Sequence, residues 1–266
     1  MDYKRAQNCS NADALVVPHI HCHGLALKYI SEKIWQMGEP EMLISVNGGA
    51  ADFNLGAETS ERVFQGLMKA QDEMKVWFVS GGTNSGVMKL LGRARTSEAP
   101  NAPLIGVPAF GAIKDHKSLL APESLDHSAG VDLEPHHSHF LLVDDGTNSL
   151  GGASHRARAA FEKAVRNRER VDDQERKMSA EGIQRTGGLV KVPYVCVVIE
   201  GGPGTILQVY EVAKQEMITL CIKGTGRAAD FLGDLALLRY YTCAVLRVLT
   251  ASYAPSSSVR HSKFVN

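Results

Sequence analysis

The strongest constraint on the fold is a repeated unit: a short, uninterrupted apolar run, then a glycine-rich turn, then a helix-like segment. The apolar runs cover residues 42–46, 76–80, 103–107, 140–143, 194–199 and 218–222. A strand that is buried on both faces is continuously apolar, whereas a half-exposed strand alternates with polar residues. The runs therefore predict a mainly parallel sheet covered by helices, which is a doubly wound α/β fold.

The segments between these runs divide the chain into a central domain and two flanks. Helical spacing is expected over residues 58–72, from about residue 85, over 154–168, and after the turns near residues 201 and 224. Residues 41–239 then form the main domain. Residues 1–40 are predicted to be an N-terminal extension with a helix from about Leu25 to Met37, and residues 240–266 a C-terminal helix with a disordered tail. The charged stretch 169–191 is predicted to be an exposed loop or a frayed helix end.

The overall charge excludes broad classes of partner. Lys plus Arg and Asp plus Glu are equal at 29 each, so the chain has no general electrostatic attraction for nucleic acid or anionic lipid. No nucleic-acid partner is expected, and any anion site must be local. The five cysteines are scattered, which predicts reduced thiols and a cytoplasmic location.

No part of the sequence is expected to insert into a membrane. The N-terminus has no apolar stretch of the kind found in a signal peptide. The most apolar long segment begins at Leu235, but it contains Arg239 and Arg247. Two arginines near the centre of a span of roughly 20 residues are costly in lipid, so a buried or amphipathic helix is predicted there.

Glycine-rich turns follow four of the predicted strands. They contain Gly48 with Gly49, Gly81 with Gly82 and Gly86, Gly201 with Gly202 and Gly204, and Gly224 with Gly226. The carboxyl ends of parallel strands form the binding crevice of an open α/β sheet. Glycine lets the backbone approach a phosphate, and the N-terminus of the following helix attracts an anion. Because Thr83, Thr205 and Thr225 add hydroxyl groups, these turns predict a phosphate site, although each could also be simply a tight turn.

The turns match neither common phosphate-binding motif. SGGTNSGVMK lacks the Lys-Ser or Lys-Thr pair of a P-loop, and no turn has the spacing Gly-x-Gly-x-x-Gly. Instead, SGGTNSGVM and EGGPGTILQ together resemble the two signature loops of the SLOG superfamily. The longer strings ISVNGGAADFN, SGGTNSGVMK, HSHFLLVDDGT, VPYVCVVIEGGPGTI and KGTGRAAD resemble, in that order, the N-terminal LSDAT region of melastatin-type transient receptor potential (TRPM) channels. The resemblance covers roughly residues 40–238.

This resemblance implies a Rossmann-like sheet with a nucleotide site on the cytosolic side of a calcium-permeable cation channel, or in a free-standing relative. The implied ligand is ADP-ribose or a related nucleotide, and the implied partners are other channel domains or subunits. The ligand contacts that the resemblance implies are Asn47, Gly48, Gly49, Gly81, Gly82, Thr83, Gly86, Val87, Met88, Arg158, Gly201, Gly202, Gly204, Thr205, Gly226 and Arg227.

Two positions depart from the family pattern. Asn47 stands where a threonine is usual, and Gly151 stands where the ADP-ribose-gated branch has an aromatic residue that stacks on the ligand. Arg227 directly follows a glycine turn, and a guanidinium group binds phosphate through two donors. Arg158 is expected either to bind phosphate or to lie on a solvated basic helix face.

A catalytic role is an alternative that the sequence disfavours. The superfamily's hydrolases end their loop with a glutamate that performs acid–base chemistry, and Gln208 stands at that position here. An amide exchanges no proton near neutral pH, which leaves only Glu211 as a substitute. Asp144 and Asp145 are expected to cap a turn or to meet a ribose hydroxyl.

The histidines are a second chemical alternative. His19, His21, Cys22 and His23 form a cluster of metal-ligand types, and His136, His137 and His139 could complete a zinc site. Structural or surface roles are the favoured interpretation, so no metal site is predicted. Spacing alone indicates no Ser-His-Asp or Cys-His catalytic arrangement.

Overall fold

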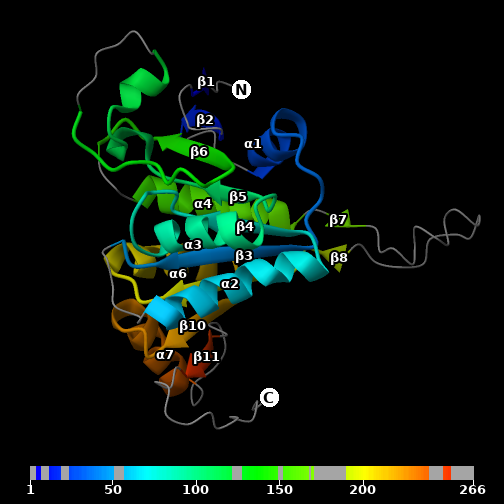
Figure 1. Cartoon of the computed structure of the whole chain (residues 1–266), viewed down its shortest axis with the longest axis vertical. Helices are drawn as coiled ribbons and strands as arrows, with labels where there is room; N and C mark the ends of the chain where they lie inside the picture. Colours follow the sequence, from blue (N-terminus) through cyan, green and yellow to red (C-terminus); the bar gives the residue numbers. More distant parts are fainter. Residues whose placement is uncertain are drawn as a thin grey trace, which may run out of the picture.

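A parallel sheet forms the centre of the molecule, as the sequence predicts. The computed structural model describes residues 4–6, 12–18, 24–50, 57–121, 128–148, 152–167, 169–170, 190–239 and 248–252. The strands of its nine-stranded sheet lie in the order β1-β2-β6-β5-β4-β3-β9-β10-β11 (Figure 1), and every neighbouring pair is parallel except β1 with β2. The strands are β1 Lys4–Arg5, β2 Asp13–Pro18, β3 Met42–Gly48, β4 Val76–Ser80, β5 Leu104–Gly106, β6 His139–Asp144, β9 Tyr194–Ile199, β10 Thr219–Lys223 and β11 Val248–Ser252.

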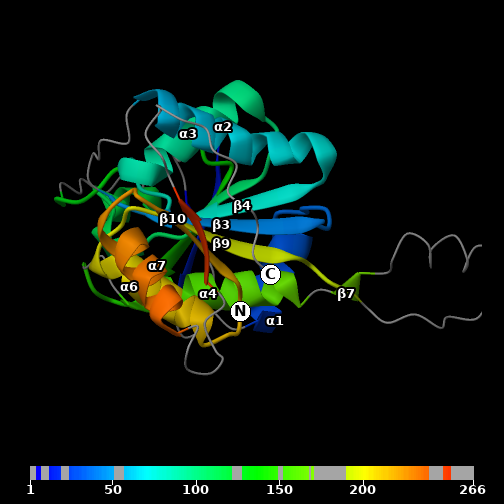
Figure 2. The ribbon, with the colours of Figure 1, turned by 90° about the horizontal axis from the view of Figure 1, so that it is seen from below.

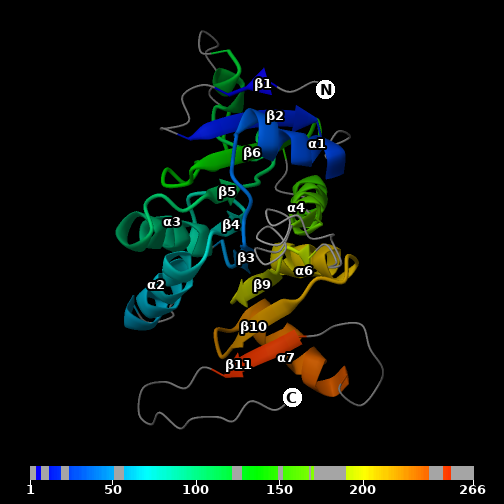
Figure 3. The ribbon, with the colours of Figure 1, turned by 90° about the vertical axis from the view of Figure 1, so that its right-hand side faces the viewer.

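Helices cover both faces of this sheet, which makes the fold a doubly wound α/β sandwich. The α-helices are α1 Gly24–Tyr29, α2 Ala57–Glu73, α3 Gly86–Glu98, α4 Gly152–Arg166, α6 Pro203–Ala213 and α7 Arg227–Arg239. A π-helical turn, η2 (Ile30–Ile34), continues α1, and two short 3-10 helices are η3 (Phe110–Ala112) and η4 (His116–Leu119). Figures 2 and 3 show α2 and α3 on one face and α1, α4, α6 and α7 on the other.

Neighbouring residues of one strand pack into hydrophobic cores on opposite faces of the sheet. On β3, Leu43 packs beneath α4 and α6, whereas Ile44 and Val46 pack with Phe64 of α2 and Leu91 of α3. Because both faces are covered, both sets of side chains must be apolar, which explains the uninterrupted runs in the sequence.

The strand order changes direction between β3 and β9. From β3 the chain proceeds outward through β4, β5 and β6, and it then returns to β9, β10 and β11 on the other side of β3. The carboxyl ends of β3 and β9 therefore lie at the topological switch point, where open α/β sheets bind their ligands.

The two flanks contribute strands that the sequence analysis did not predict. Within the predicted N-terminal extension, β2 pairs with β6 along Asp13–Pro18, and the helix expected near Leu25 is present as α1 and η2. At the other end, α7 is described as far as Arg239, and Val248–Ser252 pairs with β10, where the sequence favours a helix. Pairing with an open sheet edge outweighs local helical spacing for such a short segment.

The charged stretch 169–191 begins and ends in a small hairpin. Its strands β7 (Glu169–Arg170) and β8 (Val190–Lys191) are antiparallel and form a separate two-stranded sheet. Residues 171–189 lie outside the described part of the chain. Within the described residues, no helix has the length and apolar character needed to cross a membrane.

Candidate functional site

The four glycine turns follow four adjacent strands. The sheet order places β4, β3, β9 and β10 side by side and parallel, so the turns that begin at residues 81, 48, 200 and 224 share its carboxyl edge. Helices α3, α6 and α7 begin directly after three of these turns. Their N-termini therefore converge on this edge, and unpaired backbone N–H groups at helix N-termini attract anions.

The turns after β3 and β4 fit against each other so closely that a side chain cannot be added. A Cβ at Gly86 would lie 1.8 Å from the Gly49 carbonyl oxygen, and Gly86 has a φ of 47°. The Val87 amide donates a hydrogen bond to that same oxygen over 3.0 Å. A Cβ at Gly48 would lie 2.5 Å from the Val87 side chain. These glycines are thus required for the turns to pack, whatever they bind.

The predicted threonine donors are bonded within the turns. Thr205 Oγ1 donates to the Gly48 carbonyl over 3.1 Å, which ties the turn after β9 to the turn after β3. Thr225 Oγ1 donates to the Ile222 carbonyl and accepts from the Glu200 amide, each over 2.7 Å. Thr83 Oγ1 lies 3.1 Å from Ser85 Oγ. The hydroxyl groups therefore hold the turns together. The backbone N–H groups of Gly82, Gly202 and Gly224 are also bonded to side-chain oxygens, so only the other N–H groups of the turns are candidate donors.

Arg227 lies at this edge, at the start of α7. Its side chain is 53% exposed, and its Nη1 lies 3.6 Å from Oε1 of Glu200. A Cβ at Gly202 would lie 2.9 Å from Nη2 of Arg227, so the guanidinium group lies over the turn that starts α6. Arg227 is therefore an accessible positive charge beside a helix N-terminus, as a phosphate contact requires.

Arg158 occupies a different environment. It is 4% exposed, and its Nε donates to Oε1 of Glu162 over 2.9 Å. Its Nη2 donates to Ser45 Oγ over 2.8 Å and to the carbonyls of Val46 and Val79, each over 3.0 Å. The expected solvated basic face is therefore absent at Arg158. The guanidinium group joins β3 to β4 two residues before each glycine turn, and its predicted phosphate contact remains a hypothesis.

Three further predicted contacts also have internal partners. The side-chain Nδ2 of Asn47 donates to Ser45 Oγ over 3.2 Å and to Cys196 Sγ over 3.0 Å. Val87 and Met88 are buried in the apolar core under α2 and α3. These residues form the base of the carboxyl edge.

Gln208 lies on α6 and is buried, and it pairs with the half-buried His155. It is 1% exposed, its Oε1 lies 3.1 Å from Nδ1 of His155, and its Nε2 has no hydrogen-bond partner among the described residues. Burial lowers the pKa of His155, and this effect exceeds the opposing hydrogen bond to Gln208. Glu211, the substitute for a catalytic glutamate, is bound to Lys214 over 3.2 Å.

The aspartates at the carboxyl end of β6, Asp144 and Asp145, hold a turn. Asp144 Oδ1 accepts from the Gly146 amide over 3.0 Å, and Asp145 Oδ1 accepts from the Thr147 amide over 2.9 Å. The capping role considered for these residues is therefore present.

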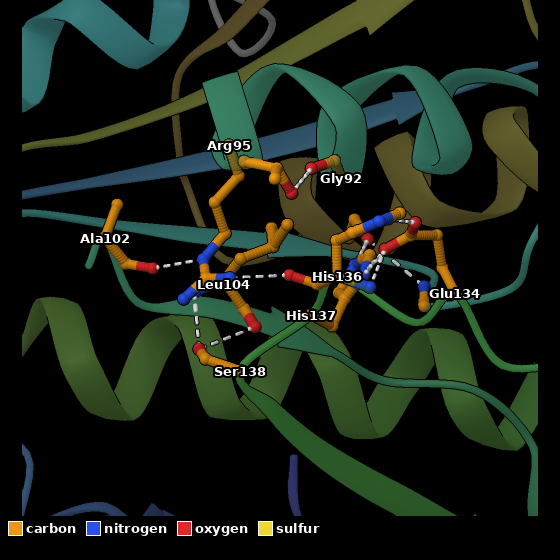
Figure 4. Close-up of polar contacts among 11 residues, drawn as sticks. Gly92, Arg95, Ala102, Leu104, Glu134, His136, His137 and Ser138 are labelled. Carbon is orange, nitrogen blue, oxygen red and sulfur yellow. Dashed lines mark hydrogen bonds and ion pairs between the residues drawn. The ribbon is translucent and has the colours of Figure 1, made fainter. Parts of the chain in front are cut away.

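A buried network beside β4 was not predicted from the sequence. Glu134 Oε2 lies 2.7 Å from Nδ1 of His137, and Oε1 lies 2.6 Å from Nδ1 of His136. Figure 4 shows these contacts next to Arg95, which donates to the carbonyls of Ala102 and His136. Burial alone raises the pKa of Glu134, but the hydrogen bonds and charges of the two histidines outweigh it and lower that pKa.

The same network contains a Ser-His-Glu series. Ser80 Oγ lies 2.7 Å from Nε2 of His137, whose Nδ1 faces Glu134 as in a catalytic triad. Ser80 is fully buried, His137 is 3% exposed, and Ser80 Oγ already accepts from the Gly82 amide over 3.1 Å. A nucleophile must be reachable by substrate, so this burial favours a structural role in which the network fixes the turn after β4. Because Ser80 and His137 are 57 positions apart in the sequence, no motif spacing predicts their contact.

One buried and two half-buried histidines predict a loss of stability in mild acid. Burial lowers the pKa of His137, His139 and His155, and that of His139 falls to about 4. Between pH 6.5 and 4 the unfolded chain therefore binds protons that the folded chain does not, so the free energy of unfolding falls as the pH falls. His139 alone should contribute a loss of about 3 kcal/mol at pH 4. Urea unfolding at stepped pH measures this, and a stability that stays constant from pH 7 to 5 would contradict it.

The cluster of metal-ligand types near the N-terminus, His19, His21, Cys22 and His23, lies outside the described part of the chain. Within the described residues, no group of three or more His, Cys, Asp or Glu side chains is arranged to hold a metal ion. The two described cysteines, Cys196 and Cys221, are free and buried. Burial raises the pKa of the Cys196 thiol to about 12 and that of Cys221 to about 11.

Comparison with known proteins identifies the same region as the sequence motifs did. The family model LSDAT_euk, described as SLOG in TRPM, matches residues 23–242. Transient receptor potential cation channel subfamily M member 2 of Mus musculus is 32% identical over 221 residues, which cover 77% of this chain and 14% of that protein. The corresponding member 6 of Homo sapiens is 32% identical over 218 residues, covering 77% of this chain and 10% of that protein.

Member 7 of Homo sapiens is 35% identical over 215 residues, covering 75% of this chain and 11% of that protein. The chain therefore spans about a seventh or less of the length of these channel proteins.

Proposed function

This chain belongs to the family of SLOG domains found in TRPM channels, and we propose that it is a sensing domain for an ADP-ribose-like nucleotide. The ligand's phosphate groups would lie at the carboxyl edge of the sheet, over the turns after β4, β3, β9 and β10. The domain would act on the cytosolic side of a calcium-permeable cation channel, or in a free-standing relative of one.

The observation that carries this proposal is the position of Arg227. Its largely exposed guanidinium group lies beside the start of α6, next to the topological switch point between β3 and β9. A phosphate there would meet a charged, two-pronged donor beside the N-terminus of a helix. Sensing further requires that the nucleotide bind one packing of this domain against its channel partners more tightly than another.

Replacing Arg227 with Ala should weaken nucleotide binding at least about tenfold, since a charge-assisted hydrogen bond contributes about 1.5–3 kcal/mol. Isothermal titration of the purified protein with ADP-ribose, AMP and ribose 5-phosphate measures the effect. Lys75→Ala is the matched control, because it removes an exposed positive charge just before β4, at the amino edge. An unchanged affinity in folded Arg227→Ala would remove Arg227 from the site.

The alternative is a soluble nucleotide-processing enzyme of the phosphoribohydrolase kind. Gln208 in place of the catalytic glutamate argues against it, because an amide performs no acid–base step. Product analysis of the titration mixtures separates the two functions. Saturable binding without turnover supports a sensor, whereas release of free base from AMP establishes the enzyme and directs attention to Glu211.

A further inference from the structure

Glu200, the first residue after β9, has an unusual and firmly held backbone. Its φ is 54°, in the left-handed region that glycine favours. Its amide donates to Thr225 Oγ1 over 2.7 Å, and its carbonyl accepts from the Ala229 amide over 2.8 Å. Left-handed backbone in a residue with a side chain is destabilising and persists only where the surroundings require it. The turn after β10 and the start of α7 thus fix the backbone from which the Glu200 side chain extends.

The carboxylate of Glu200 is buried at the carboxyl edge without a full set of donors. The residue is 8% exposed, and Oε2 has no hydrogen-bond partner among the described residues. Oε2 lies directly against the turn after β3, because a Cβ at Gly49 would be only 1.8 Å away from it. Oε1 lies 3.6 Å from Arg227, which is too long for a hydrogen bond. A buried acceptor in this state is unfavourable unless a donor, from a ligand or from water, reaches it.

The chemistry of the neighbourhood restricts which donor that is. An ionised carboxylate only accepts hydrogen bonds, so it repels the phosphate that Arg227 is proposed to bind. The ligand group that meets Glu200 beside that phosphate must therefore donate a hydrogen bond. In a nucleotide, the hydrogen-bond donors nearest to the phosphate are the ribose hydroxyls. Carboxylates hold ribose hydroxyls at the same edge of other doubly wound sheets.

We propose that Glu200 is a specificity-determining residue that accepts a hydrogen bond from a ribose hydroxyl of the ligand. This inference rests on the proposed function and adds a requirement to it. The site selects a phosphorylated ribose over inorganic phosphate, and it excludes a ligand whose hydroxyl at this position is itself phosphorylated.

Titrations with AMP, 2′-deoxy-AMP and 3′-deoxy-AMP test the inference, with EDTA present so that no divalent cation bridges carboxylate and ligand. We expect the wild-type protein to bind at least one deoxy analogue about tenfold or more weakly than AMP, as loss of a hydrogen bond to a charged group requires. Glu200→Met should bind AMP and both analogues equally, and Glu200→Gln should give an intermediate preference. Glu216→Met is the control, because Glu216 is another left-handed glutamate, exposed beyond the far end of α6.

Each outcome decides a different claim. Equal binding of AMP and both analogues by the wild-type protein overturns the role of Glu200 but leaves the nucleotide site standing. A preference that persists in folded Glu200→Met and Glu200→Gln means that another residue contacts the hydroxyl. If neither AMP nor ADP-ribose binds the wild-type protein, the proposed function itself fails. Should Glu200→Met not fold, the wild-type ratio and Glu200→Gln still decide.

Discussion

Replacing Arg158 with Ala should lower the free energy of unfolding by about 3–5 kcal/mol, the range for breaking a buried ion pair from one side. Glu162 is fully buried, and its Oε1 accepts from Arg158 and, over 2.6 Å, from Ser45. Its Oε2 accepts from Tyr194 over 2.8 Å. Loss of the guanidinium group leaves a buried negative charge and removes the donor to the carbonyls of Val46 and Val79.

Urea unfolding measures this loss, and two further variants interpret it. Arg156→Ala, an exposed arginine on the same helix, should change stability by less than about 0.5 kcal/mol. Arg158→Met combined with Glu162→Met should recover part of the loss, because no buried charge then remains unpaired. If Arg158→Ala were nearly as stable as the wild type yet bound nucleotide far more weakly, Arg158 would be a ligand contact first and a structural residue second.

Replacing Gly86 with Ala should cost about 2–5 kcal/mol and disturb the turn after β3 as well. The left-handed backbone of a residue with a side chain costs about 1–2 kcal/mol, and overfilling a packed site costs about 1–3 kcal/mol more. The new methyl group would lie 1.8 Å from the Gly49 carbonyl oxygen, so the Val87 hydrogen bond to that oxygen must also shift.

Gly66→Ala provides a control of opposite sign. Gly66 lies within α2, and a Cβ there meets no atom within 4 Å. Alanine should therefore stabilise the helix by about 0.5–1 kcal/mol. Thermal unfolding measures the change in stability of both variants. A Gly86→Ala protein as stable as the wild type would show that the turns after β3 and β4 do not pack as described.

The sequence predicted the central strands closely, because burial on both faces leaves a direct mark on composition. The runs at 76–80 and 194–199 coincide with β4 and β9. The strands at the edges of the sheet were harder to predict. The strand β2 and the strand β11 are defined by pairing with β6 and β10, and a short apolar segment at a sheet edge carries no periodicity that separates strand from helix.

The candidate site, like the fold, could be predicted from the sequence only in part. The glycine turns after strands predicted a site at the carboxyl edge of the sheet, and the strand order places the four turns on adjacent strands. The partners of individual side chains could not be predicted. Whether Arg158 faced solvent or the core depended on Glu162 and Ser45, and Ser45 is 113 residues away in the sequence. The network of Ser80, His137 and Glu134 likewise depends on contacts between distant segments. So does the Glu200 oxygen that has no partner among the described residues.

The most direct test of the central claim is to map nucleotide binding by NMR, following the backbone amide resonances while ADP-ribose is added. If the carboxyl edge is the site, saturable shifts should concentrate at Gly48–Gly49, Gly81–Thr83, Gly201–Gly202 and Gly226–Arg227, and those at the last pair should be lost in Arg227→Ala. Saturable shifts confined to another surface, with these turns unchanged, would contradict the account and leave the glycines with a purely structural role.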